Sequence, residues 1–140
     1  MTDTTIRKSV FLNASKEQVW AYLTDPDKLA IWFHKPEKTL SLGDNYSMFG
    51  TSSGDKLMWG NVMKSDPFDA LEYSFTIAPM GDATSMVKWK LEDVAGGTRL
   101  SLEHSGLPQG AEAFGLTLAL DTGWDDHMSR MRASLHEKTA

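Results

Sequence analysis

Near its C-terminus the chain reads GWDDHMSRMRASL, from Gly123 to Leu135. The large apolar residues of this stretch recur every three or four positions, which places them along one side of an α-helix. They are Trp124, Met128, Met131 and Leu135, and upstream the same stripe continues through Leu120, Leu116 or Thr117, and Phe114 or Ala113. The other sides carry charged and polar residues that water can cover. A helix this long, apolar on one side only, requires a broad apolar surface to pack against.

Segments with alternating apolar and polar residues are predicted to form that surface. The clearest lies at residues 70–77, where Leu71, Tyr73, Phe75 and Ile77 share one face of a strand. Further strands are predicted at residues 5–12, 39–42, 46–50, 56–65, 85–92 and 98–105, separated by turns and loops, including a loop at residues 79–82. Because each strand has only one apolar face, the sheet should be antiparallel, with its other face in water.

Two short helices are predicted after the first strand. The first starts with Ser15 and Gln18 at the spacing of a capping box. It ends before Pro26, which suits the first turn of a second helix capped by Asp25. The inward residues would be Val19, Trp20 and Leu23 in the first helix, and the second holds Leu29, Ile31, Trp32 and Phe33. The element order predicts an α+β fold, with a curved antiparallel sheet of seven strands around the long C-terminal helix. Residues 1–140 are predicted to form one domain.

The composition excludes several classes of protein. With 140 residues, of which 41% are hydrophobic and 24% charged, the chain is an ordinary globular protein. Its net charge of −5 and its scattered Lys and Arg argue against a nucleic-acid-binding protein. It has no cysteine for a disulfide or a Cys-type zinc site, and no apolar run approaches the roughly 20 residues of a membrane span. The polar N-terminus has no signal-peptide pattern, so a cytoplasmic location is predicted.

No motif predicts a metal site, a cofactor or a known catalytic machinery. His-x-His and His-x₃-His pairs, phosphate-binding glycine loops and nucleophile elbows do not occur. We therefore predict no cofactor and no metal. Three of the four histidines are predicted to face solvent: His34, His127 and His136. The fourth, His104, continues the inward face of Leu100 and Leu102 and is the predicted polar group at the mouth of a cavity.

Four segments, in order along the chain, carry a family resemblance. They are NASKEQVW at residues 13–20, LTDPDKLAIWF at residues 23–33, Gly60-Asn61-Val62 followed by Asp66-Pro67, and Gly123-Trp124 followed by Met128 and Met131. Together they are similar to the activator of Hsp90 ATPase group within the helix-grip superfamily, which is also called Bet v 1-like or START-related. The resemblance implies a seven-stranded sheet gripping the long helix, with a cavity that often takes lipids, polyketides or other apolar molecules. Met128 and Met131 stand where the family commonly has leucine. Nothing in the sequence corresponds to the N-terminal domain with which the eukaryotic activator engages the chaperone, so Hsp90 activation is not the expected function.

The predicted ligand site lies between the helix and the sheet. The sheet would contribute Trp59, Met63, Tyr73, Phe75 and Trp89, and the helix Leu116, Leu120, Trp124 and Met128. Trp32 would close one side, while Tyr73 and His104 would hold the polar end of a ligand. The alternation at residues 56–65 allows two registers. The first, which we favour, faces Leu57, Trp59, Asn61 and Met63 inward. The second faces Met58 and Val62 inward, with Gly60 between them.

The predicted function is binding of an apolar or amphipathic small molecule. One alternative is an enzyme of cyclase or hydrolase type, in which His104 and Tyr73 act as acid–base groups. The other is a protein-interaction module, with a chaperone or a second copy of the chain as partner. A cavity too small for a ligand would favour the interaction module, and a roomy cavity in which His104 faces Tyr73 would favour the enzyme.

Overall fold

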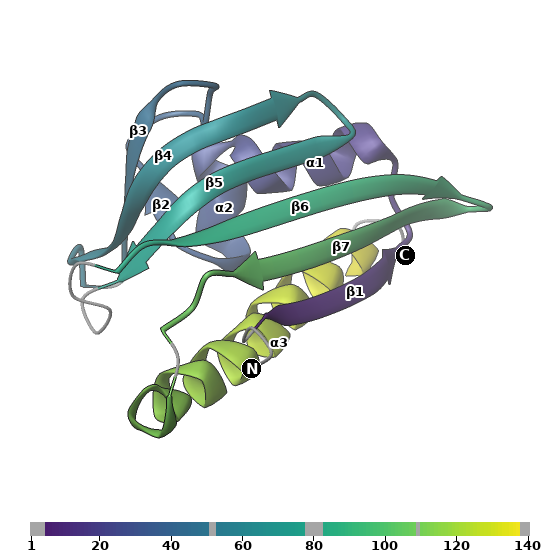
Figure 1. Ribbon diagram of the computed structural model, residues 1–140. Coiled ribbons are helices and arrows are strands. Elements are labelled where there is room, and N and C mark those ends of the chain that lie inside the picture. The colour runs from purple at the N-terminus through teal and green to yellow at the C-terminus, as the bar shows by residue number, and fades with distance from the viewer. Residues whose placement is uncertain (1–4, 51–52, 78–82, 109, 138–140) are drawn as a thin grey trace.

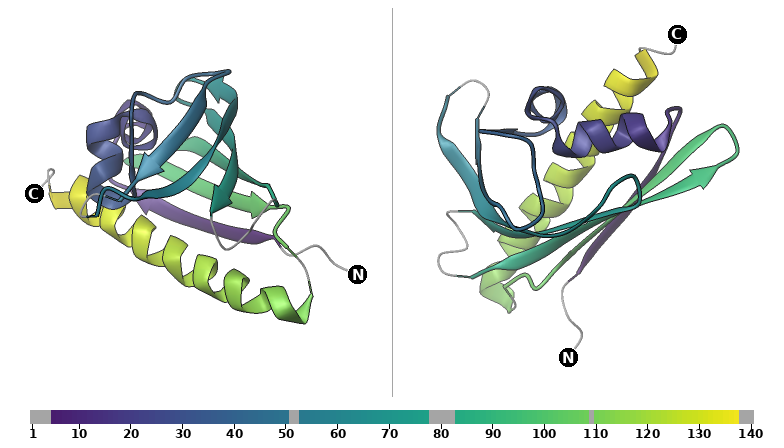
Figure 2. Two further views of the ribbon diagram at one scale, coloured as in Figure 1. Left: turned by 90° about the vertical axis from the view of Figure 1, so that its left-hand side faces the viewer. Right: turned by 90° about the horizontal axis from the view of Figure 1, so that it is seen from above.

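The structure, a computed structural model, describes residues 5–50, 53–77, 83–108 and 110–137. Within these residues seven strands form one antiparallel sheet in the order β1-β7-β6-β5-β4-β3-β2. The sheet is curved, and the helices lie on its concave side (Figures 1 and 2). The predicted α+β fold around a long C-terminal helix is confirmed. Residues 1–4 of the polar N-terminus and the predicted loop at residues 79–82 lie outside the described residues.

The elements follow one another with short connections. Strand β1 (Ile6–Leu12) leads to helices α1 (Lys16–Thr24) and α2 (Pro26–Trp32). Six strands follow: β2 (Lys35–Pro36), β3 (Asn45–Phe49), β4 (Lys56–Asp66), β5 (Ala70–Ile77), β6 (Ser85–Val94) and β7 (Gly97–Ser105). A short 3₁₀ helix, η2 (Ala111–Ala113), leads into α3 (Phe114–Glu137). The first strand completes the sheet beside the last one, because β1 pairs with β7 along its whole length.

Local sequence signals set the two short helices as predicted. Ser15 Oγ accepts from the backbone N–H of Gln18 at 3.2 Å, and the Gln18 side chain accepts from the Ser15 N–H at 2.9 Å. Asp25 caps α2 by accepting from the Asp27 N–H, and Pro26 occupies the first turn. The buried residues of these helices are Val19, Tyr22, Leu23, Thr24, Leu29 and Trp32, whereas Trp20 is only half-buried.

The long helix α3 packs its predicted stripe against the concave face. The four side chains are almost fully buried: Trp124 (2% exposed), Met128 (5%), Met131 (0%) and Leu135 (3%). Lys8, which interrupts the apolar face of β1, reaches Asp121 and Asp125 of α3 at 2.7 and 3.0 Å. Partial burial lowers the pKa of Lys8, but its bonds to the two carboxylates outweigh this effect and raise the pKa. These ion pairs fix the middle of α3 to β1.

Two predictions about the sheet were wrong. The strand after α2 lies at Lys35–Pro36, not at residues 39–42, because the backbone N–H of Leu40 bonds to Thr24 O at the end of α1. The register of β4 is the second of the two alternatives. Met58 and Val62 are each 1% exposed, whereas Met63 is 58% exposed.

Gly60 lies between Met58 and Val62 in this register of β4 and permits a close approach to β5. A Cβ atom on Gly60 would lie 2.1 Å from the carbonyl oxygen of Ser74 on β5, so only glycine permits this approach. Ser74 Oγ also accepts from the backbone N–H of Asn61 at 2.8 Å, in place of a regular ladder bond. The pairing of β4 with β5 then shifts between Val62 and Lys64. The family-like Gly60-Asn61-Val62 motif thus lies at the close approach of the two strands, and the shift follows directly after it.

Candidate functional site

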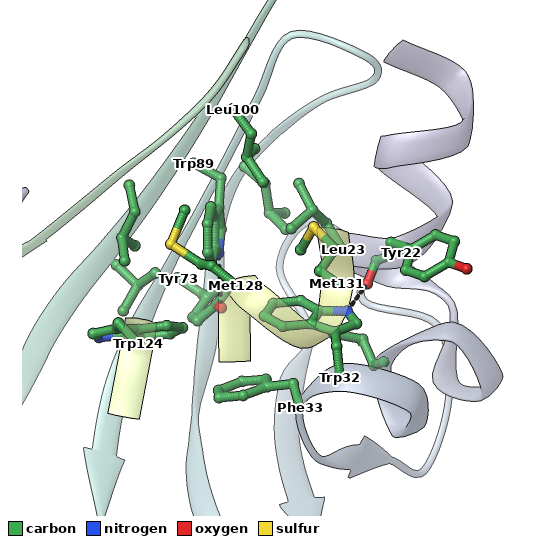
Figure 3. Packing of buried hydrophobic residues seen from close by; sticks show 14 of the residues in the cluster. Tyr22, Leu23, Trp32, Phe33, Tyr73, Trp89, Leu100, Trp124, Met128 and Met131 are labelled. Atoms are coloured by element: carbon green, nitrogen blue, oxygen red, sulfur yellow. Dashed lines mark hydrogen bonds between the residues drawn. The ribbon is translucent and has the colours of Figure 1, made fainter. Parts of the chain in front are cut away.

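Seven of the predicted ligand-site residues meet between the sheet, α2 and α3. They are Trp32, Tyr73, Phe75, Trp89, His104, Trp124 and Met128. Their rings meet edge to face, with centroids 5.9 Å apart for Trp32 and Trp89 and 5.5 Å apart for Trp89 and Trp124. Figure 3 shows Trp124, Met128 and Met131 of α3 facing Trp89 and Tyr73 of the sheet and Trp32 of α2.

These seven side chains fill the interior and leave no open cavity among themselves. None is more than 5% exposed, whereas a ligand pocket of roughly 300–1,000 Å³ would leave its lining accessible to water. The part of the predicted ligand site that these seven residues form is therefore filled by protein. Phe33 closes the space, because its ring stacks on both Trp32 and Trp124, at centroid distances of 5.1 and 5.3 Å. From the sequence, Phe33 was predicted to lie on the second short helix but not in the ligand site.

His104 belongs to a buried chain of hydrogen bonds whose direction can be derived. The Trp124 Nε1–H can only donate, so His104 Nδ1 accepts from it at 3.0 Å. A neutral imidazole then carries its proton on Nε2, which donates to Ser85 Oγ at 2.7 Å. The Ser85 hydroxyl donates in turn to the carbonyl of Phe75 at 2.9 Å. His104 does not activate Ser85 as a nucleophile, because it donates to this hydroxyl instead of accepting from it.

Tyr73 and His104 do not form an acid–base pair. Tyr73 on β5 and His104 on β7 both pair with Val87 on β6, the strand between them. The two residues are therefore separated by two strand spacings, or about 10 Å. The Tyr73 hydroxyl accepts from Trp89 Nε1–H at 3.0 Å, and burial raises the pKa of Tyr73. His104 is 0% exposed and so lies in the interior, not at a mouth as predicted. This geometry gives no support to an enzyme in which the two residues act together.

The pH dependence of stability should report the buried His104. Burial lowers the pKa of His104 to about 4, from 6.5 in an unfolded chain. Between these values the unfolded chain binds a proton that the folded protein does not, so the free energy of unfolding falls as the pH falls. The expected loss between pH 6.5 and 4 is roughly 3 kcal/mol, at about 1.4 kcal/mol for each unit of pKa difference.

Urea unfolding at a series of pH values between 7 and 4.5 measures the slope of the free energy of unfolding against pH. The control is His104→Gln, since glutamine can accept from Trp124 and donate to Ser85 but does not titrate. The slope should be shallower in the variant. An equal slope in both proteins, or an imidazole signal of His104 that titrates near 6.5, would contradict the assignment.

The first half of α3 is less firmly packed than the second. Leu116 and Leu120 continue the stripe of Trp124 but are only half-buried. Phe114 and Leu118, on another side of the helix, are 57% and 53% exposed. The first turns of α3 extend past the end of the sheet (Figures 1 and 2). The helix therefore offers apolar surface at its N-terminal end that the other described residues do not cover.

Two other predicted site residues lie outside the interior. Met63 is 58% exposed. Trp59 is half-buried on the opposite side of β4 from Met58, with Lys56 Nζ 5.0 Å from the centre of its ring. Trp59 faces outward because Met58 and Val62 face inward, and Met63 lies where the pairing of β4 with β5 shifts.

A hollow of about 720 Å³ lies on the outer face of the sheet. A row of charged residues crosses it, one from each of five strands, in the order Arg7, Glu103, Lys88, Glu72 and Lys64. The charges alternate in sign, which is typical of a sheet face covered by water. The outer face of the sheet is therefore charged along this row.

The histidines at the corner between α2 and α3 were predicted wrongly. His34 and His127 were expected to face solvent, but both are half-buried, with ring centroids 5.3 Å apart. Both contact Phe33, at centroid distances of 4.5 and 4.8 Å. No spacing in the sequence connects residues 34 and 127. The only signal in the sequence was the adjacent Trp32-Phe33 pair, whose burial packs this corner against α3. His136 is also half-buried, and its Nε2 accepts from the backbone N–H of Asn13 at 3.0 Å.

The described residues offer no further specialised centre. Among them no three His, Asp or Glu side chains are grouped so that they could hold a metal ion. None of the helices in the described ranges is long and apolar enough to cross a membrane.

The curved sheet, the long helix and the aromatic interior together define a protein of the helix-grip class. The chain belongs to the family of activator of Hsp90 ATPase homolog 1-like proteins, which it matches over residues 13–136. No curated protein sequence matches it significantly.

Solved structures show the same fold. Protein MLL2253 from Mesorhizobium loti is 21% identical, with a TM-score of 0.84 over 98% of this chain and 99% of that one. The Aha1 dimer from Colwellia psychrerythraea is 18% identical, with a TM-score of 0.77 over 94% and 96%. DynU16, a protein of the dynemicin biosynthetic locus, is 24% identical, with a TM-score of 0.83 over 96% of this chain. The chain spans only 48% of DynU16.

Proposed function

We propose that this chain binds an apolar or amphipathic small molecule between the first half of α3 and the concave face of the sheet. The change in burial along α3 carries this proposal. Trp124, Met128 and Met131 are locked in the core, whereas Leu116 and Leu120 on the same stripe are only half-buried. An apolar ligand placed beside Leu116 and Leu120 would cover surface that the protein leaves partly in water. We further propose that residues 1–140 form one START-like domain that acts in the cytoplasm.

One feature would let the first turns of α3 move away from the sheet. In the described part of the chain the ion pairs of α3 begin at Asp121, which binds Lys8. Among the described residues, the turns before Asp121 are therefore held to the sheet by apolar contacts, which a ligand could replace.

The test is the binding of an apolar fluorescent probe, 1-anilinonaphthalene-8-sulfonate, followed by its own emission. The wild type should bind the probe saturably. Leu120→Trp should fill the space between α3 and the sheet and abolish binding, while circular dichroism shows the fold intact. The matched control is Leu118→Trp, because Leu118 is 53% exposed on the other side of the same helix. It should bind like the wild type.

Three results would overturn the proposal. They are no saturable binding by the wild type, undiminished binding by Leu120→Trp, and equal loss in both variants. The last result would place the probe on the exposed side of the helix.

A protein-interaction role is the second candidate, and both the filled interior and the exposed side of α3 favour it. Phe114 and Leu118 are spaced by four residues, so they form one apolar patch at the end of the helix. A second copy of the chain could cover this patch, and one structural neighbour is described as a dimer. Sedimentation equilibrium of the wild type and of Leu118→Ser tests this alternative. A dimer that dissociates in the variant supports it, and a monomeric wild type contradicts it.

A further inference from the structure

The corner between α2 and α3 brings together two imidazoles and a guanidinium. Helix α2 ends at Trp32, and His34 follows two residues later. His127 and Arg130 face this corner from α3, one turn apart. The rings of His34 and His127 lie edge to face at 5.3 Å. This cluster is separate from the proposed ligand gap at the start of α3.

Two groups compete for a single ring nitrogen of His127. His127 Nδ1 lies 2.9 Å from the carbonyl oxygen of Trp32 and 2.6 Å from Arg130 Nη2. A carbonyl only accepts and a guanidinium only donates, and a ring nitrogen can serve just one of them. If Nδ1 carries a proton for Trp32, it opposes an N–H of Arg130 at close range. If Nδ1 accepts from Arg130, the Trp32 carbonyl loses its donor.

The charges around the cluster do not supply the missing acceptor. Among the described residues no carboxylate oxygen lies within 4.0 Å of Arg130. Asp126 acts on His127 only through its charge, and Asp27 is paired with Lys35 at 3.7 Å. Within the same residues His34 has no side-chain hydrogen bond, although burial first, and then His127 and Arg130, lower its pKa to about 4. Two groups, Arg130 and His34, can therefore donate to an acceptor from outside.

We propose that His34, His127 and Arg130 form a binding site for a small oxyanion, with carboxylate or phosphate oxygens as the shared chemistry. An oxyanion would accept from the guanidinium of Arg130 and draw it away from His127. His127 Nδ1–H would then donate to the Trp32 carbonyl without competition. The anion would also accept from the ring of His34, and its negative charge would favour protonation of that ring. Binding should therefore be accompanied by proton uptake below neutral pH.

The experiment follows the imidazole signals of His34 and His127 by NMR during titration with inorganic phosphate and, in a second arm, with acetate. Sodium chloride keeps the ionic strength constant. Saturable shifts of both histidines are expected, together with a rise in the apparent pKa of His34. The anion that binds with the lower dissociation constant identifies phosphate or carboxylate as the preferred oxyanion. Arg130→Gln should weaken binding roughly tenfold or more, as expected for loss of a charged hydrogen bond.

The matched control is Arg132→Gln, an exposed cation two residues further along α3. It should bind phosphate or acetate like the wild type. The proposal is overturned if neither anion gives saturable shifts, or if both Arg variants weaken binding equally, which would indicate diffuse attraction. His34→Asn provides a second check, because it should lower the proton uptake while the protein remains folded.

Discussion

The Gly60→Ala variant is expected to lose about 4 kcal/mol of its free energy of unfolding, in the upper range for single substitutions. The added Cβ would lie 2.1 Å from Ser74 O and 2.8 Å from its carbonyl carbon, and neither atom is the end of a flexible side chain. The same carbonyl accepts from the buried hydroxyl of Tyr46 at 2.5 Å. Making room for the methyl group must therefore separate β4 from β5 and break this bond as well.

Urea unfolding of Gly60→Ala and Gly123→Ala provides the comparison. At Gly123 the added Cβ would meet no atom within 4 Å, and the residue lies inside a helix. Gly123→Ala should therefore gain about 0.5–1 kcal/mol from helix propensity and reduced freedom of the unfolded chain. Similar midpoints for the two variants would show that the close approach of Gly60 to Ser74 does not limit the fold.

The Trp124→Ala variant is expected to lose about 3–5 kcal/mol, the range for deletion of a large aromatic side chain from a core. The indole contacts Phe33, Phe75, Trp89 and His104, and it is only 2% exposed. Its loss would open a cavity at the centre of the aromatic cluster. An unchanged urea midpoint would show that α3 is not anchored there.

Trp124→Phe separates packing from hydrogen bonding at this position. Phenylalanine keeps much of the ring but removes the Nε1–H that donates to His104 Nδ1. That bond stabilises the neutral imidazole, so its loss should raise the pKa of His104, besides costing about 1–3 kcal/mol for a buried acceptor without a partner. An NMR titration of His104 in the variant measures the shift. A pKa equal to that of the wild type would show that the indole donor does not hold His104 neutral.

Local patterns in the sequence were sufficient for most of the fold. The capping box of Ser15 and Gln18, and the stripe from Trp124 to Leu135, involve neighbours within a few residues, and both were predicted correctly. The register of β4 was not, because it depends on the approach of Gly60 to Ser74 on the next strand. Alternation alone cannot distinguish a regular strand from one with a bulge.

The candidate site was predicted only in part, for a similar reason. Seven inward residues could be named from their strands and helices, because each position needs only a local period. Whether large side chains leave a cavity or fill it depends on how they interlock in three dimensions. Phe33 decides the question by stacking between Trp32 and Trp124. The contact of His34 with His127 likewise joins distant segments that no motif links.

The pairing of β1 with β7 affects the order in which the chain can fold during synthesis. Strands β3 to β7 are joined to their neighbours in the sheet by short connections, so they can pair as soon as each leaves the ribosome. Strand β1 is made before the other six strands, yet its partner residues, from Thr98 to His104, lie in β7, the last of them to be made. Until then Ile6, Val10 and Leu12 have no sheet to join. Until β7 is made, the nascent chain therefore carries an unpaired strand with an apolar face, the kind of segment that chaperones bind and that pairs wrongly with other chains.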